Sequence, residues 1–553
     1  MTDCSSLTQY IQAAIRDNWE LPAMTNFHGQ SFQYREVARK IVKLHIMFEA
    51  AGLKAGDKIA LCGRNSSQWS IALMATMTYG AVAVPILNDF KPDTIHHLVN
   101  HSEARLLFVG MSNWENLDPQ AMTGLEGVFL IDDYSLLLCQ NNGLADARSH
   151  LNEYFGQRYP ERFKPDDVSF PVIDIEHTAL INYTSGSTGF SKGVMLSGRV
   201  LWSNIQYCID HLKFLGRGDT MVSMLPLAHM FGLMVELFNP FVRGCHIYFL
   251  TRTPSPRIIM EAFAVVKPKL IVTVPLIIEK IIKTRVFPLL DKPLMKVLLH
   301  LPFVDTHLLG KIKDQLDTTF GGNLQQMIIG GAGLSPDVEA FLRKIKFPFT
   351  VGYGMTECGP LIAYAPWEVQ RPASCGRIVD RMQARIDSPD PATIPGVLWV
   401  KGDNVMSGYY KNSEATDNVF NNGWMNTGDI CNMDHDGYLY IRGRDKSMIL
   451  GPSGQNIYPE EIEQKLNNMP YVCESLVIDS GGGQLQALIY PDFENAERQG
   501  IPSEELDNLM KVNVQQLNQE LPAYSHIAST RIFYEEFEKT PKRSIKRFLY
   551  QPK

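Results

Sequence analysis

The chain has 553 residues, several times the length of a typical domain, so we expect more than one folding unit. Hydrophobic residues make up 45% of the chain and charged residues 20%, an ordinary composition for a soluble globular protein. The formal net charge of −7 argues against a general nucleic-acid-binding protein, whose affinity needs a basic surface.

The cysteines and the N-terminus indicate the compartment. Nine cysteines are scattered along the chain, with no Cys-x-x-Cys pair and therefore no disulfide-framework or zinc spacing. This usage predicts reduced thiols in a cytoplasmic protein. The N-terminal residues MTDCSSLTQY lack the basic start and apolar run of a signal peptide.

The first long apolar stretch, residues 70–88, reads SIALMATMTYGAVAVPILN and carries no charge. Its length approaches that of a membrane span, but Gly80 and Pro85 divide it. Residues 71–79 instead predict a buried helix, and AVAVPI predicts a short interior strand. We therefore expect no transmembrane span, and peripheral contact with the inner face of the membrane stays open.

Short runs rich in β-branched residues alternate with helical patterns such as IIMEAFAVV and DVEAFLRKI. The runs are KIALCG near 60, HTALINYT near 180, DTMVSMLPL near 224, KLIVTV near 271 and LQQMIIGG near 327. This alternation predicts an α/β domain with largely parallel, buried strands. After about residue 370, short strands and turns predict a more antiparallel, β-rich region. A last block from about 446 contains one clear helix, IYPEEIEQKL, and two strands, SLVIDS and QLQALIYP.

Residues 183–193, YTSGSTGFSKG, connect a strand, INYT, to a second run, VML. A P-loop needs Gly-Lys followed by Ser or Thr, but Lys192 lies between Ser191 and Gly193. A nucleophile elbow, Gly-x-Ser-x-Gly, is matched literally by residues 189–193, yet the strand and helix that it requires do not flank it. Two alternatives stay open: an idle surface loop, and a loop whose N–H groups, hydroxyls and lysine hold phosphate.

The same stretch resembles the signature loop of the acyl-adenylate-forming (AMP-binding) enzymes, approximately Y-T-S-G-[ST]-T-G-x-P-K-G-V, with Ser191 in place of the proline. Other motifs of that family follow in its order and spacing, and the likeness is greatest to fatty-acid and long-chain acyl-CoA synthetases. These motifs are LPLAHMFG at 225–232, GGAGLS at 330–335, GYGMTECGP at 352–360, GVLWVKGDNVMSGYYKN at 396–412, WMNTGD at 424–429 and IRGRDKSMILGPSGQNIYPEEIE at 441–463.

The resemblance implies a large N-terminal domain, residues 1–445, built of stacked, mostly parallel sheets with flanking helices and a β-rich subdomain. A small, mobile α+β domain, residues 446–553, follows a hinge at Lys446. An exposed charged turn is the alternative for Lys446. The loop around Gly454 would help form a channel for CoA.

The resemblance also implies roles in the adenylation site. Thr356 would donate to the α-phosphate and Glu357 would ligate Mg²⁺, with Thr184 as a second ligand. Asp429 would accept the ribose hydroxyls with support from Arg444, and His229 would line the acyl entrance. The remaining residues would bind the nucleotide: Thr184, Ser185, Gly186, Ser187, Thr188, Gly189 and Lys192 at the phosphates, Gly331, Ala332 and Gly333 flat against adenine, and Tyr353 and Gly354.

Three of these residues also have a structural role as the alternative. Glu357 alone would be a solvated loop carboxylate, Asp429 a turn cap after Gly428, and His229 a core histidine bonded to a carbonyl. The implied reaction uses ATP, Mg²⁺ and CoA to convert a fatty acid to acyl-CoA, AMP and pyrophosphate. Aryl acids, transfer to acyl carrier protein and binding of ATP or acyl-AMP without turnover are the alternatives. The apolar stretch VPLIIEKIIKTRVFPLL fits a lipid tunnel, but packing is the expected role of most of its side chains.

In relatives the tail reads approximately T-P-T-x-K, and its lysine enters the adenylation site. Aligning Thr540-Pro541 with that pattern puts Ser544 at the position of the lysine. If the segment is extended, Lys542 and Lys546 flank Ser544 on one face. We therefore expect Lys542 to supply the missing charge. The rivals are slow adenylation without that lysine and a tail that serves only an anionic surface or the phosphates of CoA.

Overall fold

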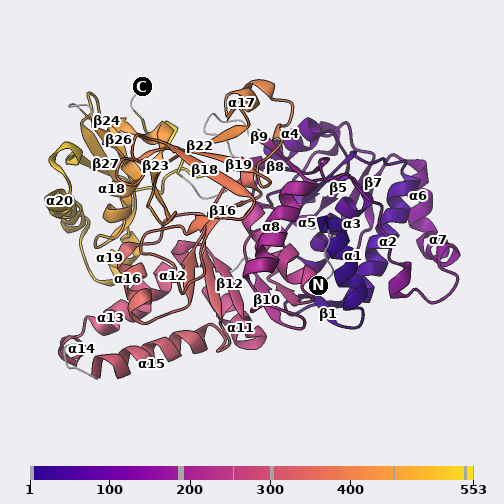
Figure 1. Ribbon diagram of the computed structural model, residues 1–553, viewed down its shortest axis with the longest axis horizontal. Coiled ribbons are helices and arrows are strands. Elements are labelled where there is room, and N and C mark those ends of the chain that lie inside the picture. Colours follow the sequence, from indigo (N-terminus) through magenta and orange to yellow (C-terminus); the bar gives the residue numbers. More distant parts are fainter. Residues whose placement is uncertain are drawn as a thin grey trace.

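The computed structural model describes residues 5–184, 192–252, 255–298, 304–451, 455–540 and 545–551. Figure 1 shows an elongated molecule, with α6 (Asn142–Ser149) and α7 (Leu151–Arg158) at one end. Toward the other end lie α18 (Pro459–Leu466) and α20 (Ser503–Glu520).

A long mixed sheet forms the centre of the N-terminal part. Its strands in spatial order are β20 (Gly408–Tyr409), β9 (Lys192–Ser197), β8 (Thr178–Thr184), β4 (Val82–Ile86), β3 (Lys58–Cys62), β5 (Ala104–Val109), β6 (Gly127–Leu130) and β7 (Leu136–Cys139). Strands β8, β4, β3, β5 and β6 pair in parallel, whereas β7, β9 and β20 join antiparallel. The parallel strands are buried on both faces, which explains their nearly continuous apolar sequences.

The helix and strand predicted within residues 70–88 are both present. Helix α3 (Ser67–Tyr79) begins where the hydroxyl of Ser66 accepts a hydrogen bond from the backbone N–H of Trp69, and it ends at Gly80, whose φ is +93°. The helix is buried from Ser67 to Thr78, and β4 follows it into the sheet. The apolar sequence therefore reflects burial in the core. Among the described residues, no helix combines the length and apolar character that crossing a bilayer requires.

Two smaller sheets complete the α/β part. The first has the order β10 (Thr220–Ser223), β11 (His246–Phe249), β1 (Pro22–Asn26), β2 (Ser31–Gln33); the second is parallel, with β12 (Leu270–Thr273), β13 (Gln326–Ile329) and β14 (Phe349–Val351). The helices packed around the sheets include α1 (Leu7–Asp17), α2 (Tyr34–Ala50), α4 (Pro92–Ser102), α8 (Gly198–His211), α11 (Pro256–Val266), α12 (Pro275–Ile281), α15 (Val304–Thr319) and α16 (Pro336–Lys344). The predicted helices IIMEAFAVV and DVEAFLRKI correspond to α11 and α16.

The region after residue 370 is antiparallel, as predicted. A short sheet of β15 (Tyr353–Gly354), β16 (Leu361–Tyr364) and β17 (Arg377–Ile378) leads into a larger one of β18 (Met382–Asp387), β19 (Gly396–Gly402), β22 (Trp424–Met433), β21 (Phe420–Asn421) and β23 (Leu439–Arg444). Register pairs Asp429 of β22 with Arg444 of β23, which places these two side chains at one end of the sheet.

The C-terminal part has its own hydrophobic core, which extends from Ile457 to Ile527. Helices α18, α19 (Phe493–Arg498) and α20 pack with β26 (Val472–Asp479), β27 (Leu485–Pro491) and β28 (Ile527–Ile532). The short hairpin of β24 (Ile449–Leu450) and β25 (Asn456–Ile457) precedes them. A large N-terminal domain of sheets and helices with a smaller α+β C-terminal domain is therefore confirmed as the fold class.

Candidate functional site

The stretch YTSGSTGFSKG joins two antiparallel strands. Thr184, the last residue of β8, pairs with Lys192, the first residue of β9, and the Thr184 hydroxyl donates to the Lys192 carbonyl at 3.5 Å. Because Lys192 begins a strand, the helix that a P-loop or a nucleophile elbow needs does not follow it, in agreement with the sequence, which matched neither motif in context. The predicted phosphate-binding residues Ser185 to Gly189 lie outside the described residues.

Tyr409 connects Lys192 to the GYGMTE motif. The Lys192 ammonium lies 4.8 Å from the centre of the Tyr409 ring, and the Tyr409 hydroxyl donates to Glu357 Oε1 at 3.0 Å. Burial, followed by the nearby Glu357, raises the pKa of Tyr409, so its hydroxyl keeps the proton that it donates. A cation and a carboxylate from distant motifs thus contact the same tyrosine, one at its ring and the other at its hydroxyl.

Glu357 is held by its backbone as well as by Tyr409. It lies in the single turn η5 (Thr356–Cys358), and its carbonyl accepts a hydrogen bond from the Met406 N–H at 2.8 Å. Its carboxylate is half-buried and bonded to a neutral phenol, which makes a freely solvated loop carboxylate the wrong alternative. Thr356, predicted to contact the α-phosphate, is the first residue of the same turn.

Close packing accounts for one of the predicted glycines, and backbone conformation accounts for another. A Cβ on Gly354 would lie 2.1 Å from the carbonyl oxygen of Pro360. Gly331 has a φ of +89°, which side chains other than glycine rarely adopt. The glycine at 331 therefore has a backbone cause that needs no contact with adenine, and the adenine role of Gly331, Ala332 and Gly333 stays a prediction.

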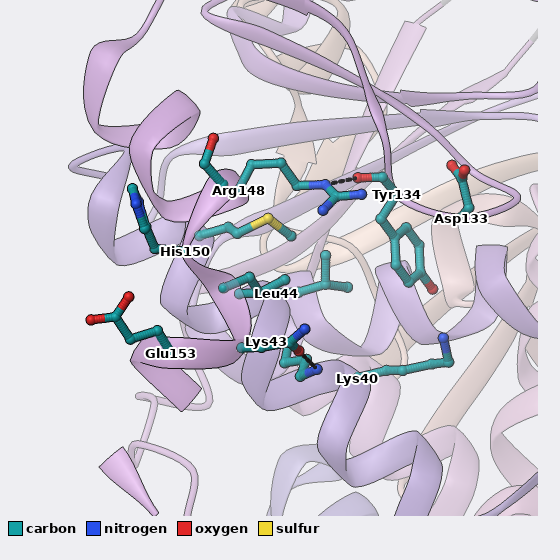
Figure 2. A pocket seen from close by; sticks show the side chains of 12 residues that line it. Lys40, Lys43, Leu44, Asp133, Tyr134, Arg148, His150 and Glu153 are labelled. Atoms are coloured by element: carbon teal, nitrogen blue, oxygen red, sulfur yellow. Dashed lines mark hydrogen bonds between the residues drawn. The ribbon is translucent and has the colours of Figure 1, made fainter. Parts of the chain in front are cut away.

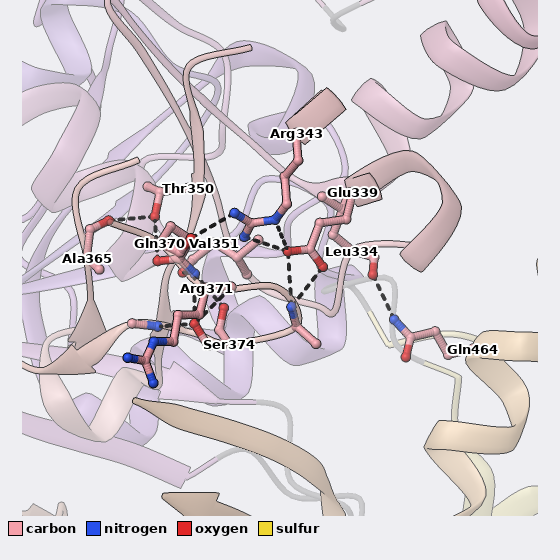
Figure 3. Close-up of polar contacts among 12 residues, drawn as sticks. Leu334, Glu339, Arg343, Thr350, Val351, Ala365, Gln370, Arg371, Ser374 and Gln464 are labelled. Atoms are coloured by element: carbon pink, nitrogen blue, oxygen red, sulfur yellow. Dashed lines mark hydrogen bonds and ion pairs between the residues drawn. The ribbon is translucent and has the colours of Figure 1, made fainter. Parts of the chain in front are cut away.

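The loop that carries these glycines rests against both domains, as Figure 3 shows in part. The Gln464 side chain of α18 donates to the Leu334 carbonyl at 2.8 Å, and the Ser335 N–H donates to Glu279 Oε1 at 2.7 Å. On the following helix, the buried Glu339 pairs with Arg343 at 2.8 Å. These contacts hold the residues that directly follow the exposed loop 331–333.

The same network continues beneath the GYG strand. Arg343 donates to the Gln370 carbonyl at 2.7 Å, and the Thr350 hydroxyl of β14 donates to Gln370 Oε1 at 3.1 Å. Gln370 in turn donates to the Ser374 carbonyl at 2.5 Å. Because these groups are bonded to one another, they hold β14 in place, and Tyr353 follows this strand two residues later.

Asp429, Tyr353 and Arg444 form a bonded group. Arg444 Nε lies 2.8 Å from Asp429 Oδ1, and the Tyr353 hydroxyl donates to Asp429 Oδ2. The Asp429 side chain is 5% exposed and the Arg444 side chain 55%. Its carboxylate serves these two partners, so the turn-cap alternative for Asp429 is wrong.

Burial raises the pKa of Asp429 above its ordinary value, and Glu357 raises it further, while Arg444 and Tyr353 lower it. The effect of Glu357 shows that the Tyr353–Asp429–Arg444 group lies within electrostatic reach of the Lys192–Tyr409–Glu357 group. Two groups that each contain predicted residues thus lie near each other.

A pH dependence follows from the pKa of Asp429. If its carboxylate accepts the ribose hydroxyls, ATP affinity should fall as the pH decreases, beginning at a higher pH than for an ordinary aspartate. Asp429→Asn should bind ATP about 10-fold more weakly at neutral pH, the value of one charge-assisted hydrogen bond, and should lose this part of the pH dependence. ATP dissociation constants between pH 5 and 8 provide the measurement.

Arg444→Gln is the companion variant, because Arg444 lowers the pKa of Asp429. Without that guanidinium the loss of ATP affinity should begin at a still higher pH. The protonation of ATP itself affects all variants alike, so only the differences between the variants in the pH dependence of ATP affinity are interpreted. A profile unchanged by Asp429→Asn contradicts the ribose role.

His229 begins the helical segment of LPLAHMFG. It precedes α9 (Met230–Gly232) and is half-buried, and the Asn182 side chain donates to the neighbouring Ala228 carbonyl at 2.8 Å. The ring of Phe231 lies against Gly330, where an added Cβ would come within 3.1 Å of it. This motif therefore contacts the GGAG loop, while the acyl role of His229 stays a prediction.

Sequence reasoning missed Glu236. It is fully buried in the π-helical segment η3 (Leu233–Phe238), and its Oε2 accepts hydrogen bonds from Ser223 Oγ and the N–H groups of Met224 and Leu225. Burial raises the pKa of Glu236 well above its ordinary value. The signal was an acid inside an apolar run. Tyr409 was missed as well, although it stands in a quoted motif.

The predicted hinge and CoA channel fall in the segment that joins the domains. Lys446 is exposed on the single turn η6 (Asp445–Ser447), between β23 and β24. Both a hinge and an ordinary exposed charged turn agree with this position, so the hinge stays a prediction. Gly454 lies outside the described residues.

The described residues on either side of 541–544 contact each other. Lys539 and Ile545 pair antiparallel, and the Lys546 N–H donates to the Glu538 carbonyl at 2.8 Å. The expectation that Lys542 and Lys546 flank Ser544 on one extended face stays a prediction. Lys542 and Ser544 themselves are outside the described residues.

The basic residues described in the tail are paired within the domain. Lys539 lies 2.7 Å from Glu474, and Lys546 lies 3.0 Å from Glu538. Arg547 forms an ion pair with the buried Glu463. These pairings reduce the charge available to an anionic surface.

The apolar stretch after residue 274 is mostly packed, as expected. Pro275, Ile278, Ile282 and Val286 are buried, whereas Leu276 is 67% exposed.

Comparisons with known proteins agree with the motif order. The model of a family described as AMP-binding enzyme matches residues 11–410, and that of the AMP-binding enzyme C-terminal domain matches residues 446–551. A luciferin 4-monooxygenase from Photuris pensylvanica is 27% identical over 484 residues, which cover 84% of this chain and 81% of the relative.

A long-chain-fatty-acid–CoA ligase from Escherichia coli is also 27% identical, over 506 residues that cover 86% of this chain and 83% of the relative. Among solved structures, ATP-bound MatB from Rhodopseudomonas palustris aligns with a TM-score of 0.75 and 22% identity, covering 99% of this chain and 98% of that one. The structural likeness shows a shared fold.

Proposed function

Because this chain belongs to the AMP-binding enzyme family, we propose that it activates a medium- to long-chain fatty acid with ATP and transfers the acyl group to CoA. In the first half-reaction, a carboxylate oxygen attacks the α-phosphorus and pyrophosphate leaves, giving acyl-AMP. In the second, the thiol loses its proton, its sulfur attacks the acyl carbon and AMP leaves. The family predicted from the ordered motifs is confirmed by the two family models.

The observation that carries this proposal is the placement of Lys192 and Glu357 around Tyr409. A carboxylate must approach a polyphosphate, so the site has to offset repulsion between two anions. Lys192 would pair with the departing pyrophosphate. The Tyr409 hydroxyl holds the Glu357 carboxylate beside the ring that Lys192 contacts.

The donors around Glu357 fit Mg²⁺. No group of three or more His, Cys, Asp or Glu side chains that could hold a metal occurs within the described part of the chain. Mg²⁺ commonly uses only one or two carboxylates, together with substrate phosphates and water, so Glu357 and the Thr184 hydroxyl would be enough protein ligands. When bound, Mg²⁺ would neutralise phosphate charge.

The nucleoside would be held by the second group. Asp429 accepts from Tyr353 and Arg444 but each carboxylate oxygen can accept more than one hydrogen bond, so the ribose hydroxyls have acceptors. Thr356 would donate to the α-phosphate, next to the attacking oxygen. His229 would line the path of the acid.

The choice of a fatty acid rests on the motifs around LPLAHMFG and on the relatives named long-chain-fatty-acid–CoA ligase. A luciferin 4-monooxygenase is equally identical, so aryl acids and acyl carrier protein as acceptor are the alternatives to test.

The test is AMP formation by the purified protein with ATP, Mg²⁺ and CoA, using a panel of fatty, aryl and amino acids. We expect AMP and pyrophosphate with medium- or long-chain fatty acids. ADP as product, or reaction with a non-fatty acid only, contradicts the proposal. Acyl carrier protein in place of CoA identifies the acceptor.

A second candidate function, binding of ATP or acyl-AMP without turnover, is favoured by Ser544 alone. Pyrophosphate release by Lys542→Ala, Lys546→Ala and Ser544→Lys separates the two. We expect loss confined to Lys542→Ala, since Lys546 is already paired with Glu538. If neither alanine variant changes the rate and Ser544→Lys raises it by roughly 10²-fold, the range of a positioned charge, the natural protein is an impaired enzyme or a binder.

A further inference from the structure

A cavity of about 500 Å³ lies at the end of the molecule opposite the C-terminal domain (Figures 1 and 2). It is lined by helix α2, the turn that carries Asp133 and Tyr134, and the junction of α6 and α7. None of the residues predicted for ATP, acid or CoA lines it.

Three basic side chains converge on this cavity, as Figure 2 shows. Lys40 and Lys43 lie one helical turn apart on α2, and Arg148 reaches in from α6. His150 and the apolar side chains Leu44 and Met47 complete this side of the lining.

These three cations have only neutral partners at contact distance. Lys40 Nζ lies 5.6 Å from the centre of the Tyr134 ring, Lys43 Nζ donates to Asn152 Oδ1 at 2.6 Å, and Arg148 Nε donates to the Tyr134 carbonyl at 3.2 Å. Across the described ranges, no carboxylate lies within the 4.0 Å of an ion pair from any of the three.

The two acids of the cavity accept hydrogen bonds from neighbouring residues; the hydrogen bonds from Ser135 lower the pKa of Asp133, and the Arg148 charge lowers it to a smaller extent. Asp133 accepts from the N–H of Ser135 at 2.9 Å, and Glu153 accepts from the Gln157 side chain at 3.1 Å. Two lysines and one arginine against these two carboxylates leave the lining of the cavity with a charge of +1, His150 not counted.

The cations repel one another. Burial lowers the pKa of Lys43, and Arg39, Lys40 and Arg148 each lower it further. Burial also lowers the pKa of Lys40, while Glu36 opposes the shift. An anion placed between these side chains would remove this repulsion.

We propose that this cavity binds an organic phosphate, a phosphate mono- or diester with an attached apolar body. Lysine and arginine together supply several charge-assisted donors for phosphate oxygens. A volume of about 500 Å³ is that of a small-molecule site and exceeds the needs of a lone phosphate. The apolar side chains Leu44, Met47 and Leu151 would contact the body.

The experiment measures binding by calorimetry to the full chain, with inorganic phosphate, soluble dihexanoyl phosphatidic acid and CoA as separate probes. The wild type is compared with the Lys40→Gln/Lys43→Gln double variant. Lys54→Gln, which neutralises an exposed lysine outside the cavity, is the matched control. CoA bound at the catalytic site is common to all three proteins, so only differences between them count.

We expect the double variant to bind one organic probe about 100-fold more weakly, since each lost charge-assisted bond is worth about 10-fold. Lys54→Gln should match the wild type. The affected probe identifies the source, a lipid headgroup or a nucleotide-type cofactor. Equal binding of every probe by all three proteins overturns the proposal, as does an effect on inorganic phosphate alone.

Stability and a second variant guard against misfolding. Without anion, Lys43→Gln should melt no lower than the wild type, because a repelled charge is removed. At saturating probe, the melting temperature should rise in the wild type and not in the double variant. Glu153→Gln, which keeps every cation, should bind the probe more tightly, and weaker binding by that variant contradicts the site.

Discussion

Glu357→Gln is expected to slow pyrophosphate release by about 10²-fold or more, because glutamine is a poor ligand for the ion that neutralises phosphate charge. The variant keeps the shape of the side chain and an oxygen that can accept from the Tyr409 hydroxyl. The loss should therefore be chemical and leave the fold intact. The rate is measured at several Mg²⁺ concentrations, and the Mg²⁺ needed for half-maximal rate should rise.

Two variants sharpen this test. Glu368→Gln removes an exposed carboxylate nearby in sequence and should match the wild type. Tyr409→Phe removes the hydroxyl but leaves the ring beneath Lys192, so its loss should be smaller, about 10-fold. A Glu357→Gln enzyme with unchanged rate and Mg²⁺ dependence contradicts the metal role.

Lys446→Pro should separate the two half-reactions. Proline restricts φ at the residue proposed as the pivot between the domains, so one domain orientation should be trapped. We expect adenylate formation to survive while thioester formation falls about 10²-fold or more, the effect of a bias of about 2.7 kcal/mol between the orientations. Pyrophosphate release and acyl-CoA formation are measured separately.

The interface described here indicates what such a rotation would break. Gln464 is bonded to the Leu334 carbonyl, and Asn468 receives a hydrogen bond from Lys283 at 2.6 Å. Lys446→Ala removes the charge without restricting φ and should leave both half-reactions close to the wild type. Equal loss of both in Lys446→Pro would count against the hinge.

The sequence by itself determined the family, the fold class and most local elements. Helix α3 and strand β4 follow from apolar pattern and from Gly80, and the hairpin around YTSGSTGFSKG follows from the strands on either side. These features depend on neighbours in the chain, whose periodicity and turn chemistry can be read directly.

Tertiary structure decided which side chains meet. Strand β10 ends at Ser223, earlier than its apolar run suggests, and the next two backbone N–H groups donate to the Glu236 carboxylate. Tyr409 lies between Lys192 and Glu357 only because β20 joins the sheet beside β9. No local pattern encodes such contacts.

The tail and the basic cavity are two further examples of contacts that tertiary structure decides. Lys539 and Ile545 are six residues apart and pair antiparallel, a contact that spacing along an extended chain does not predict. Lys43 and Arg148 are remote in sequence and face one cavity because α6 packs against α2. Residue types and order are local information, whereas the meeting of distant charges depends on how the whole core packs.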